Sequence, residues 1–173
     1  MNRQEALQQL AGALGILAGP QKIVSPYLTD FLPRWQTTLG YSLKVLEKMP
    51  AGKFSYTPSP TQRTFGQQFT HAAYWNSFYV GLLARQPPLP EPKELSKEIV
   101  IDYYKTCHAQ CTAVFETLTD VQLDQTGYGK EAYWQKHTGR DILLRAYTHT
   151  AHHRAQALVY LRLNDIEPPF FEF

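Results

Sequence analysis

The stretch from Arg140 to Asn164 reads RDILLRAYTHTAHHRAQALVYLRLN and contains neither proline nor glycine. Within it, His149 and His153 are four residues apart. Because an α-helix turns by about 100° per residue, this spacing places both imidazoles on one face, one turn apart. Both lie on the stripe expected to face a core, which consists of Ile142, Ala146, His149, His153, Ala157 and Tyr160. The stretch therefore predicts a long helix with a histidine pair on its buried side.

Three further helical patterns precede this one, separated by connections rich in proline and glycine. They are expected from about Pro26 to Lys48, from Thr64 to Arg85 and from Ser96 to Leu118. Pro33 lies inside the first pattern and predicts a kink or a restart there. The segment 119–137 is too irregular for a helix prediction, and part of it is expected to be extended.

The last helix is expected to begin at Thr138, because Thr138-Gly-Arg-Asp141 resembles a capping box. Four long helices without convincing alternating strands predict an all-α fold, a four-helix bundle over residues 25–173. Residues 1–24 are expected to form an N-terminal extension with an additional short helix. A cryptic export signal is the alternative for this extension, because Arg3 precedes a short apolar run, although Glu5 argues against it.

Composition and charge exclude several classes of partner. The chain of 173 residues carries a net charge of +2, and no run of basic residues forms the stripe that nucleic acid requires. No stretch approaches the roughly 20 apolar residues of a membrane helix. The sequence therefore predicts a soluble protein that acts on a small molecule, with neither nucleic acid nor membrane as a partner.

The two cysteines, Cys107 and Cys111, lie four residues apart on the third helix. Two buried, reduced thiols are the expected state, which suits the cytoplasm. A metal site formed by both cysteines and His108 is the alternative. It is disfavoured because positions i, i+1 and i+4 of one helix do not converge on one ion.

A second apolar stripe on the last helix is more than one bundle core needs. It consists of Leu144, Tyr147, Ala151 and Leu158. The stripe predicts a subunit contact, and with it a homodimer.

A histidine pair on one helix leaves a metal ion short of ligands, because catalytic sites usually supply three protein ligands and keep one position open. His71 is the best candidate for the third, since it lies mid-helix among apolar and aromatic residues. His108 has a more polar setting, His137 lies in a loop, and His152 is turned away from His153. The residues alone leave two readings open: a metal site, or three unrelated histidines in a plain bundle.

The last helix resembles the signature helix of the DinB-like family. There, a histidine and a second one four residues later are followed by arginine, a small residue and glutamine, then Leu-Arg; here these are His149, His153, Arg154, Ala155, Gln156 and Leu161-Arg162. The segment from Thr64 to His71 resembles the family's second helix, which carries the remaining ligand. The resemblance extends over nearly the whole chain, from about Ser25 to Phe173.

The resemblance implies that His71, His149 and His153 bind one divalent ion, zinc or nickel in the first place, with water completing the shell. Two positions depart from the family pattern: Thr150 stands where many relatives have glutamate, and Ala155 stands where glycine is usual. The missing glutamate also excludes the His-Glu-x-x-His pattern of metalloproteases.

The resemblance permits two metal-dependent activities, because characterised relatives include thiol S-transferases and a thiol-dependent isomerase while others are labelled metal-dependent hydrolases. The first would use a low-molecular-weight thiol as cosubstrate. Trp75, Asn76, Trp134 and His137 are expected to line the pocket. A non-catalytic bundle that binds metal for stability, or serves as a stress-associated interaction protein, is the alternative.

Overall fold

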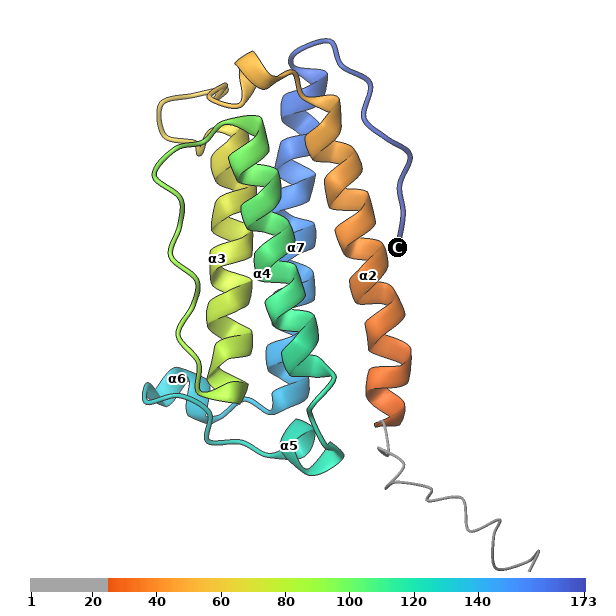
Figure 1. Ribbon diagram of the computed structural model, residues 1–173, viewed down its shortest axis with the longest axis vertical. Helices are drawn as coiled ribbons and strands as arrows, with labels where there is room; N and C mark the ends of the chain where they lie inside the picture. The colour runs from red at the N-terminus through yellow and green to blue at the C-terminus, as the bar shows by residue number, and fades with distance from the viewer. Residues whose placement is uncertain (1–24) are drawn as a thin grey trace, which may run out of the picture.

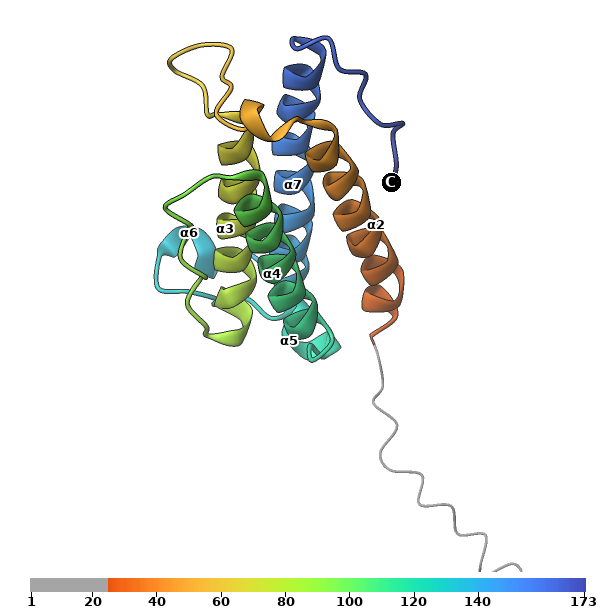
Figure 2. The ribbon, with the colours of Figure 1, turned by 45° about the horizontal axis from the view of Figure 1, so that its top comes forward.

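The computed structural model describes residues 25–173, which contain six α-helices, one 3-10 turn and no strand (Figure 1). Four long helices lie side by side, as Figure 2 also shows. They are α2 (Pro26–Lys48), α3 (Phe65–Ala84), α4 (Lys97–Phe115) and α7 (Gly139–Arg162); the short elements are η1 (Ala51–Lys53), α5 (Asp120–Asp124) and α6 (Ala132–Gln135). The predicted four-helix bundle is confirmed. The expected N-terminal extension and its short helix fall on residues outside the described range.

Helix α3 packs extensively against both α4 and α7. It is buried on more than one side, and His71 lies next to α7. The core has two parts along the bundle. Trp35 and Phe115 lie in one, and Phe65 and Leu161 in the other, all fully buried. The two parts of the core hold both ends of α3 and α7, and they thereby fix the faces of these helices that carry the histidines.

The proline inside α2 does not restart the helix. Pro33 lies within a continuous helix from Pro26 to Lys48. Phe31 and Trp35, on either side of it, are buried against Phe115 with ring centroids 5.4 and 5.2 Å apart. These contacts hold the two halves of α2 against one core, so the lost backbone hydrogen bond of the proline is tolerated.

The segment 119–137 is more helical than predicted. It contains α5 and α6, each only one turn or slightly longer. The Thr119 side chain caps α5 by accepting from the backbone N–H of Gln122, whose side chain accepts in return from the N–H of Thr119. The expectation that no helix forms here is wrong, because a capping box of the form Thr-x-x-Gln stabilises a turn that is too short to show a periodic pattern. Between the two short helices the backbone is extended at Gln125 and Glu131, as expected for part of the segment.

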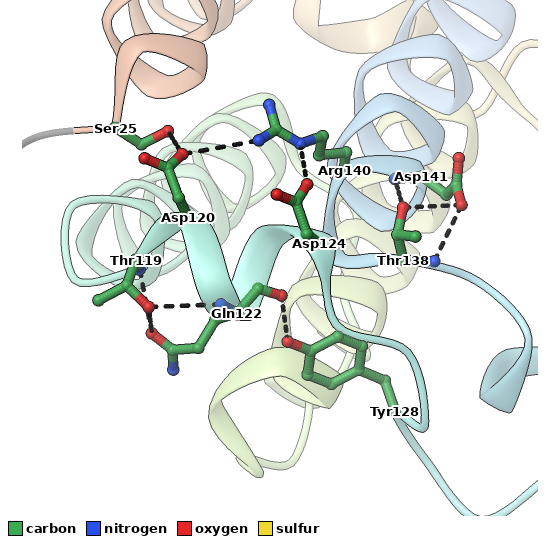
Figure 3. A network of polar contacts seen from close by, with 9 residues as sticks. All are labelled: Ser25, Thr119, Asp120, Gln122, Asp124, Tyr128, Thr138, Arg140 and Asp141. Carbon is green, nitrogen blue, oxygen red and sulfur yellow. Dashed lines mark hydrogen bonds and ion pairs between the residues drawn. The ribbon is translucent and has the colours of Figure 1, made fainter.

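A polar network ties this segment to the ends of α2 and α7 (Figure 3). Arg140 on α7 pairs with Asp124 at 2.6 Å and with Asp120 at 3.6 Å, and Asp120 accepts from the hydroxyl of Ser25. Thr138 accepts from the N–H of Asp141 and completes the predicted capping box of α7. The start of the histidine-bearing helix is thus anchored at its first turn.

The second apolar stripe of α7 is only partly covered in the described chain. Leu144 is exposed, and Tyr147, Ala151 and Leu158 are half-buried. The homodimer that this stripe suggests stays a prediction. Both cysteines are buried and free, as expected. Among the described helices, none combines the length and apolar character needed to cross a bilayer.

Candidate metal centre

His71 from α3 meets His149 and His153 from α7 in one cluster. Each offers a nitrogen, and the three nitrogens lie within 4.8 Å of one another. The Nε2 atoms of His149 and His153 are 3.1 Å apart. The ring centroid of His71 lies 5.4 Å from that of His149 and 4.6 Å from that of His153. The structure therefore brings together the three histidines that the sequence nominates from two separate helices.

Burial keeps these imidazoles neutral. It lowers the pKa of His71 and of His149 from 6.5 to about 4, and that of His153 to about 3. The positive charge of Arg63 and the neighbouring histidines add to the effect on each pKa. A neutral imidazole has a free lone pair, which is the form that binds a metal ion.

A chain of hydrogen bonds fixes the tautomer of His153. The Tyr160 hydroxyl donates to the backbone carbonyl of Arg63 at 3.0 Å, so it accepts from the Gln68 amide N–H at 3.0 Å. The same amide group donates to Gln156 at 2.9 Å. The Gln68 oxygen must then face His153 and accept from Nδ1–H at 2.7 Å. The proton is held on Nδ1, and the lone pair of Nε2 points toward His149.

The neighbouring His149 is left short of a partner. Its Nδ1 atom is buried and has no hydrogen-bond partner among the described residues. If Nδ1 carries the proton, two Nε2 lone pairs face each other at 3.1 Å. A cation between them would accept both lone pairs. In a tetrahedral zinc site with Zn–N of 2.0–2.1 Å, two ligand nitrogens are about 3.3 Å apart. The donor set and its spacing fit a divalent ion.

The predicted pocket-lining residues separate into two groups. The Trp75 ring packs against His71, with centroids 6.1 Å apart, and Trp134 contacts Tyr79, whose ring lies against His149. Asn76 instead lies in the interior and donates to Thr150 at 2.6 Å. His137 lies in a separate small pocket near the start of α7. Only the two tryptophans are placed next to the cluster or its aromatic surround.

The remaining histidines have other surroundings. His108 is buried and stacks on Trp35, with ring centroids 4.4 Å apart. Its Nε2 atom hydrogen-bonds the backbone carbonyl of Trp35 at 3.1 Å, so the setting of His108 is less polar than expected. His152 is exposed and contacts Gln156. The position that holds glutamate in many relatives, Thr150, faces Asn76 rather than the three imidazoles.

Two residues beside the cluster were missed by sequence reasoning. Gln68 is buried three residues before His71, and a glutamine at that spacing on an apolar stripe is the signal that could have identified it. Arg63 lies in the loop before α3 and shares a pocket of about 420 Å³ with His71. A single arginine in a loop carries no periodic signal. A larger pocket, of about 970 Å³, lies at the other end of α3 and contains none of the three histidines.

The lowered histidine pKa values predict how the metal-free protein responds to acid. Unfolded histidines titrate near 6.5, whereas these three stay neutral to about pH 4 or below in the folded chain. The unfolded state therefore binds more protons in between, so stability is complete above about pH 6.5 and falls as the pH drops toward 4. Urea midpoints of chelator-treated protein should decrease from pH 7 to pH 5. A constant midpoint would contradict the prediction, because carboxyl groups titrate mainly below this range.

Comparisons with known proteins identify the family of the chain. The family model of the DinB superfamily matches residues 34–157. The uncharacterized protein YjoA of Bacillus subtilis (strain 168) is 26% identical over 132 residues, which are 75% of this chain and 86% of YjoA.

Solved structures share the fold. A DinB-like protein from Bacillus cereus ATCC 10987 has a TM-score of 0.70 at 18% identity, covering 82% of this chain and 95% of that one. The crystal structure of YjoA has a TM-score of 0.68 at 22% identity, covering 83% and 98%. Because the family model covers most of the bundle, including all three clustered histidines, the chain belongs to the DinB superfamily.

Proposed function

We propose that His71, His149 and His153 bind one divalent metal ion, zinc or nickel, and that the loaded protein is an enzyme that transfers a low-molecular-weight thiol to an electrophilic small molecule. The observation that carries the metal site is the convergence of three neutral imidazole nitrogens within 4.8 Å. Bound there, the ion would supply a Lewis acid that lowers the pKa of a thiol or water molecule beside it.

Thiol transfer is favoured over hydrolysis by the residues around the cluster. Hydrolysis by activated water commonly uses a carboxylate as general base. Within residues 25–173, no carboxylate belongs to the three-histidine group, although Glu91 lines the pocket that His71 shares. The Thr150 side chain accepts from Asn76. A thiol needs less help to lose its proton, since its pKa of about 8.5 lies far below that of water. The protein groups then have to position the thiol and exclude water.

The test uses untagged full-length protein, stripped of metal and reloaded with zinc or nickel. Elemental analysis gives the metal content per chain. Conjugation of a panel of thiols to a chlorodinitrobenzene and hydrolysis of nitrophenyl esters are then measured side by side, with the His149→Ala variant as the site-deficient control. We expect about one ion per chain, with metal-dependent conjugation that the variant lacks.

Three other outcomes would each change the proposal. Metal-dependent ester hydrolysis without conjugation would replace transfer by hydrolysis. One ion per chain without turnover of either substrate would favour the non-catalytic, metal-stabilised bundle. Protein that remains empty after reloading would refute the metal site itself.

A further inference from the structure

Arg63 and His71 line the same pocket. The volume of about 420 Å³ lies within the roughly 300–1,000 Å³ of small-molecule sites. The pocket is lined by Thr61, Gln62, Arg63, Gln67, His71 and Glu91. Arg63 is the one cationic side chain that lines this pocket, and it therefore faces the same space as His71.

The backbone of Arg63 is fixed to the histidine cluster. Its carbonyl accepts the Tyr160 hydroxyl, the first link in the chain that runs through Gln68 to His153. Thr64, the next residue, caps α3 through a capping box with Gln67. The backbone is thus held at Arg63 itself and at the residue that follows it, so the Arg63 side chain starts from a defined point beside the site.

The Arg63 guanidinium has no anionic partner in the described part of the chain. None of the ion pairs there includes it, and Glu91, across the same pocket, does not come within 4.0 Å. Exposed arginines often lack a partner, but this one lines a pocket whose metal-binding residues are neutral. A bound divalent ion would add two positive charges to the one on Arg63, whereas Glu91 is the one carboxylate that lines the pocket. This excess of positive charge favours an anionic ligand.

We infer that Arg63 recognises an anionic group of the thiol substrate, a carboxylate in the first place, while the thiol sulfur lies at the three-histidine site. The inference rests on the proposed function and adds the substrate class to it. A guanidinium matches a carboxylate with two parallel hydrogen bonds, which would set the direction in which the thiol enters.

The experiment compares two thiols of the same shape, 3-mercaptopropionate and 3-mercaptopropionamide, which differ in charge. Each is titrated into the full-length protein loaded with cobalt(II), and binding is followed by the visible absorption of the cobalt. We expect Arg63→Gln to weaken binding of the carboxylate about tenfold or more, the range of a hydrogen bond between charged groups, and to change the amide less than about twofold. Arg63→Lys should retain part of the preference.

Arg34→Gln is the matched control, since it removes the same charge from an exposed position on α2 that does not line the pocket. It should bind both thiols like the unmodified protein. Equal weakening by both Gln variants would reduce the effect to net charge and overturn the inference. So would unchanged carboxylate binding in Arg63→Gln. If the loaded protein binds neither thiol, the proposed transferase fails as well, which distinguishes the two ideas.

Discussion

Replacing His153 by alanine is expected to abolish metal-dependent stabilisation. His153 is the most buried of the three histidines and the only one whose tautomer is fixed by a side chain. An ion present at about 1,000 times its Kd stabilises the native state by about 4 kcal/mol. For a chain of this size, that raises the Tm by about 8–16 °C. Removing one of three ligands should weaken zinc binding by roughly three orders of magnitude, and the increment should vanish.

The matched control is His152→Ala, which removes an exposed imidazole from the adjacent position. Thermal unfolding is measured for both variants with zinc and with chelator, and the difference between the two conditions is compared. The zinc-dependent difference in Tm reports metal binding alone. The direct cost of deleting a buried side chain lowers the Tm of His153→Ala equally in zinc and in chelator, so it does not enter the difference. A zinc-dependent rise in Tm that survives in His153→Ala, or that is also lost in His152→Ala, would refute the assignment.

The long helices are predictable because their signals are local and repeated. Helix α7 has a cap at Thr138, and its core-facing stripe continues over about five turns from Ile142 to Tyr160. The short helices α5 and α6 are not predicted, because a single turn is too short to show a periodic pattern of apolar residues. The continuity of α2 is not predicted for a different reason. The local preference of proline favours a kink or a restart at Pro33, but the packing of Phe31 and Trp35 in the core overrides this preference. Sequence reasoning thus fails where tertiary contacts decide.

The residues of the candidate site also differ in how well the sequence predicts them. His149 and His153 follow from spacing on one helix, and His71 follows from its mid-helix position among apolar and aromatic residues. The family resemblance implies the same three residues. Gln68 orients His153, and Arg63 lines the pocket. The spacing of three between Gln68 and His71 is a signal in the sequence, whereas Arg63 lies in a loop that has no periodic pattern. Asn76 shows the converse error: it is near His71 in sequence, but the helix turns it by about 140° into the interior.

The Arg154 that follows the second histidine has a structural explanation here. It is buried, donates to the Thr38 carbonyl at 3.2 Å and to the Ser42 hydroxyl at 3.3 Å, and its guanidinium lies 4.4 Å from the Tyr41 ring centroid. These contacts join α7 to α2 directly behind His153. The arginine of the helix signature therefore holds the histidine-bearing helix in place, and contact with a substrate is not needed to account for it.

Gln68→Leu is expected to weaken zinc binding by about 10- to 100-fold, the usual effect of removing the acceptor behind a ligating histidine. Leucine keeps the approximate volume but leaves Nδ1–H of His153 without its acceptor. The imidazole can then adopt the other tautomer, with the proton on Nε2, where the ion should bind. The affinity is measured by competition with a fluorescent zinc chelator on folded protein, so a loss of stability does not enter the comparison.

Two further variants separate the orienting effect from general damage to the network. Gln68→Glu keeps an acceptor for His153 but loses the N–H groups that bond Gln156 and Tyr160. Tyr160→Phe removes only the distal hydroxyl. If the acceptor matters, zinc affinity should remain within about tenfold of the unmodified protein in both, because His153 keeps its partner. Equal losses in all three variants would mean that the network holds the helices together, and that Gln68 does not set the tautomer. The comparison thus determines whether the glutamine acts on the ligand or only on the fold.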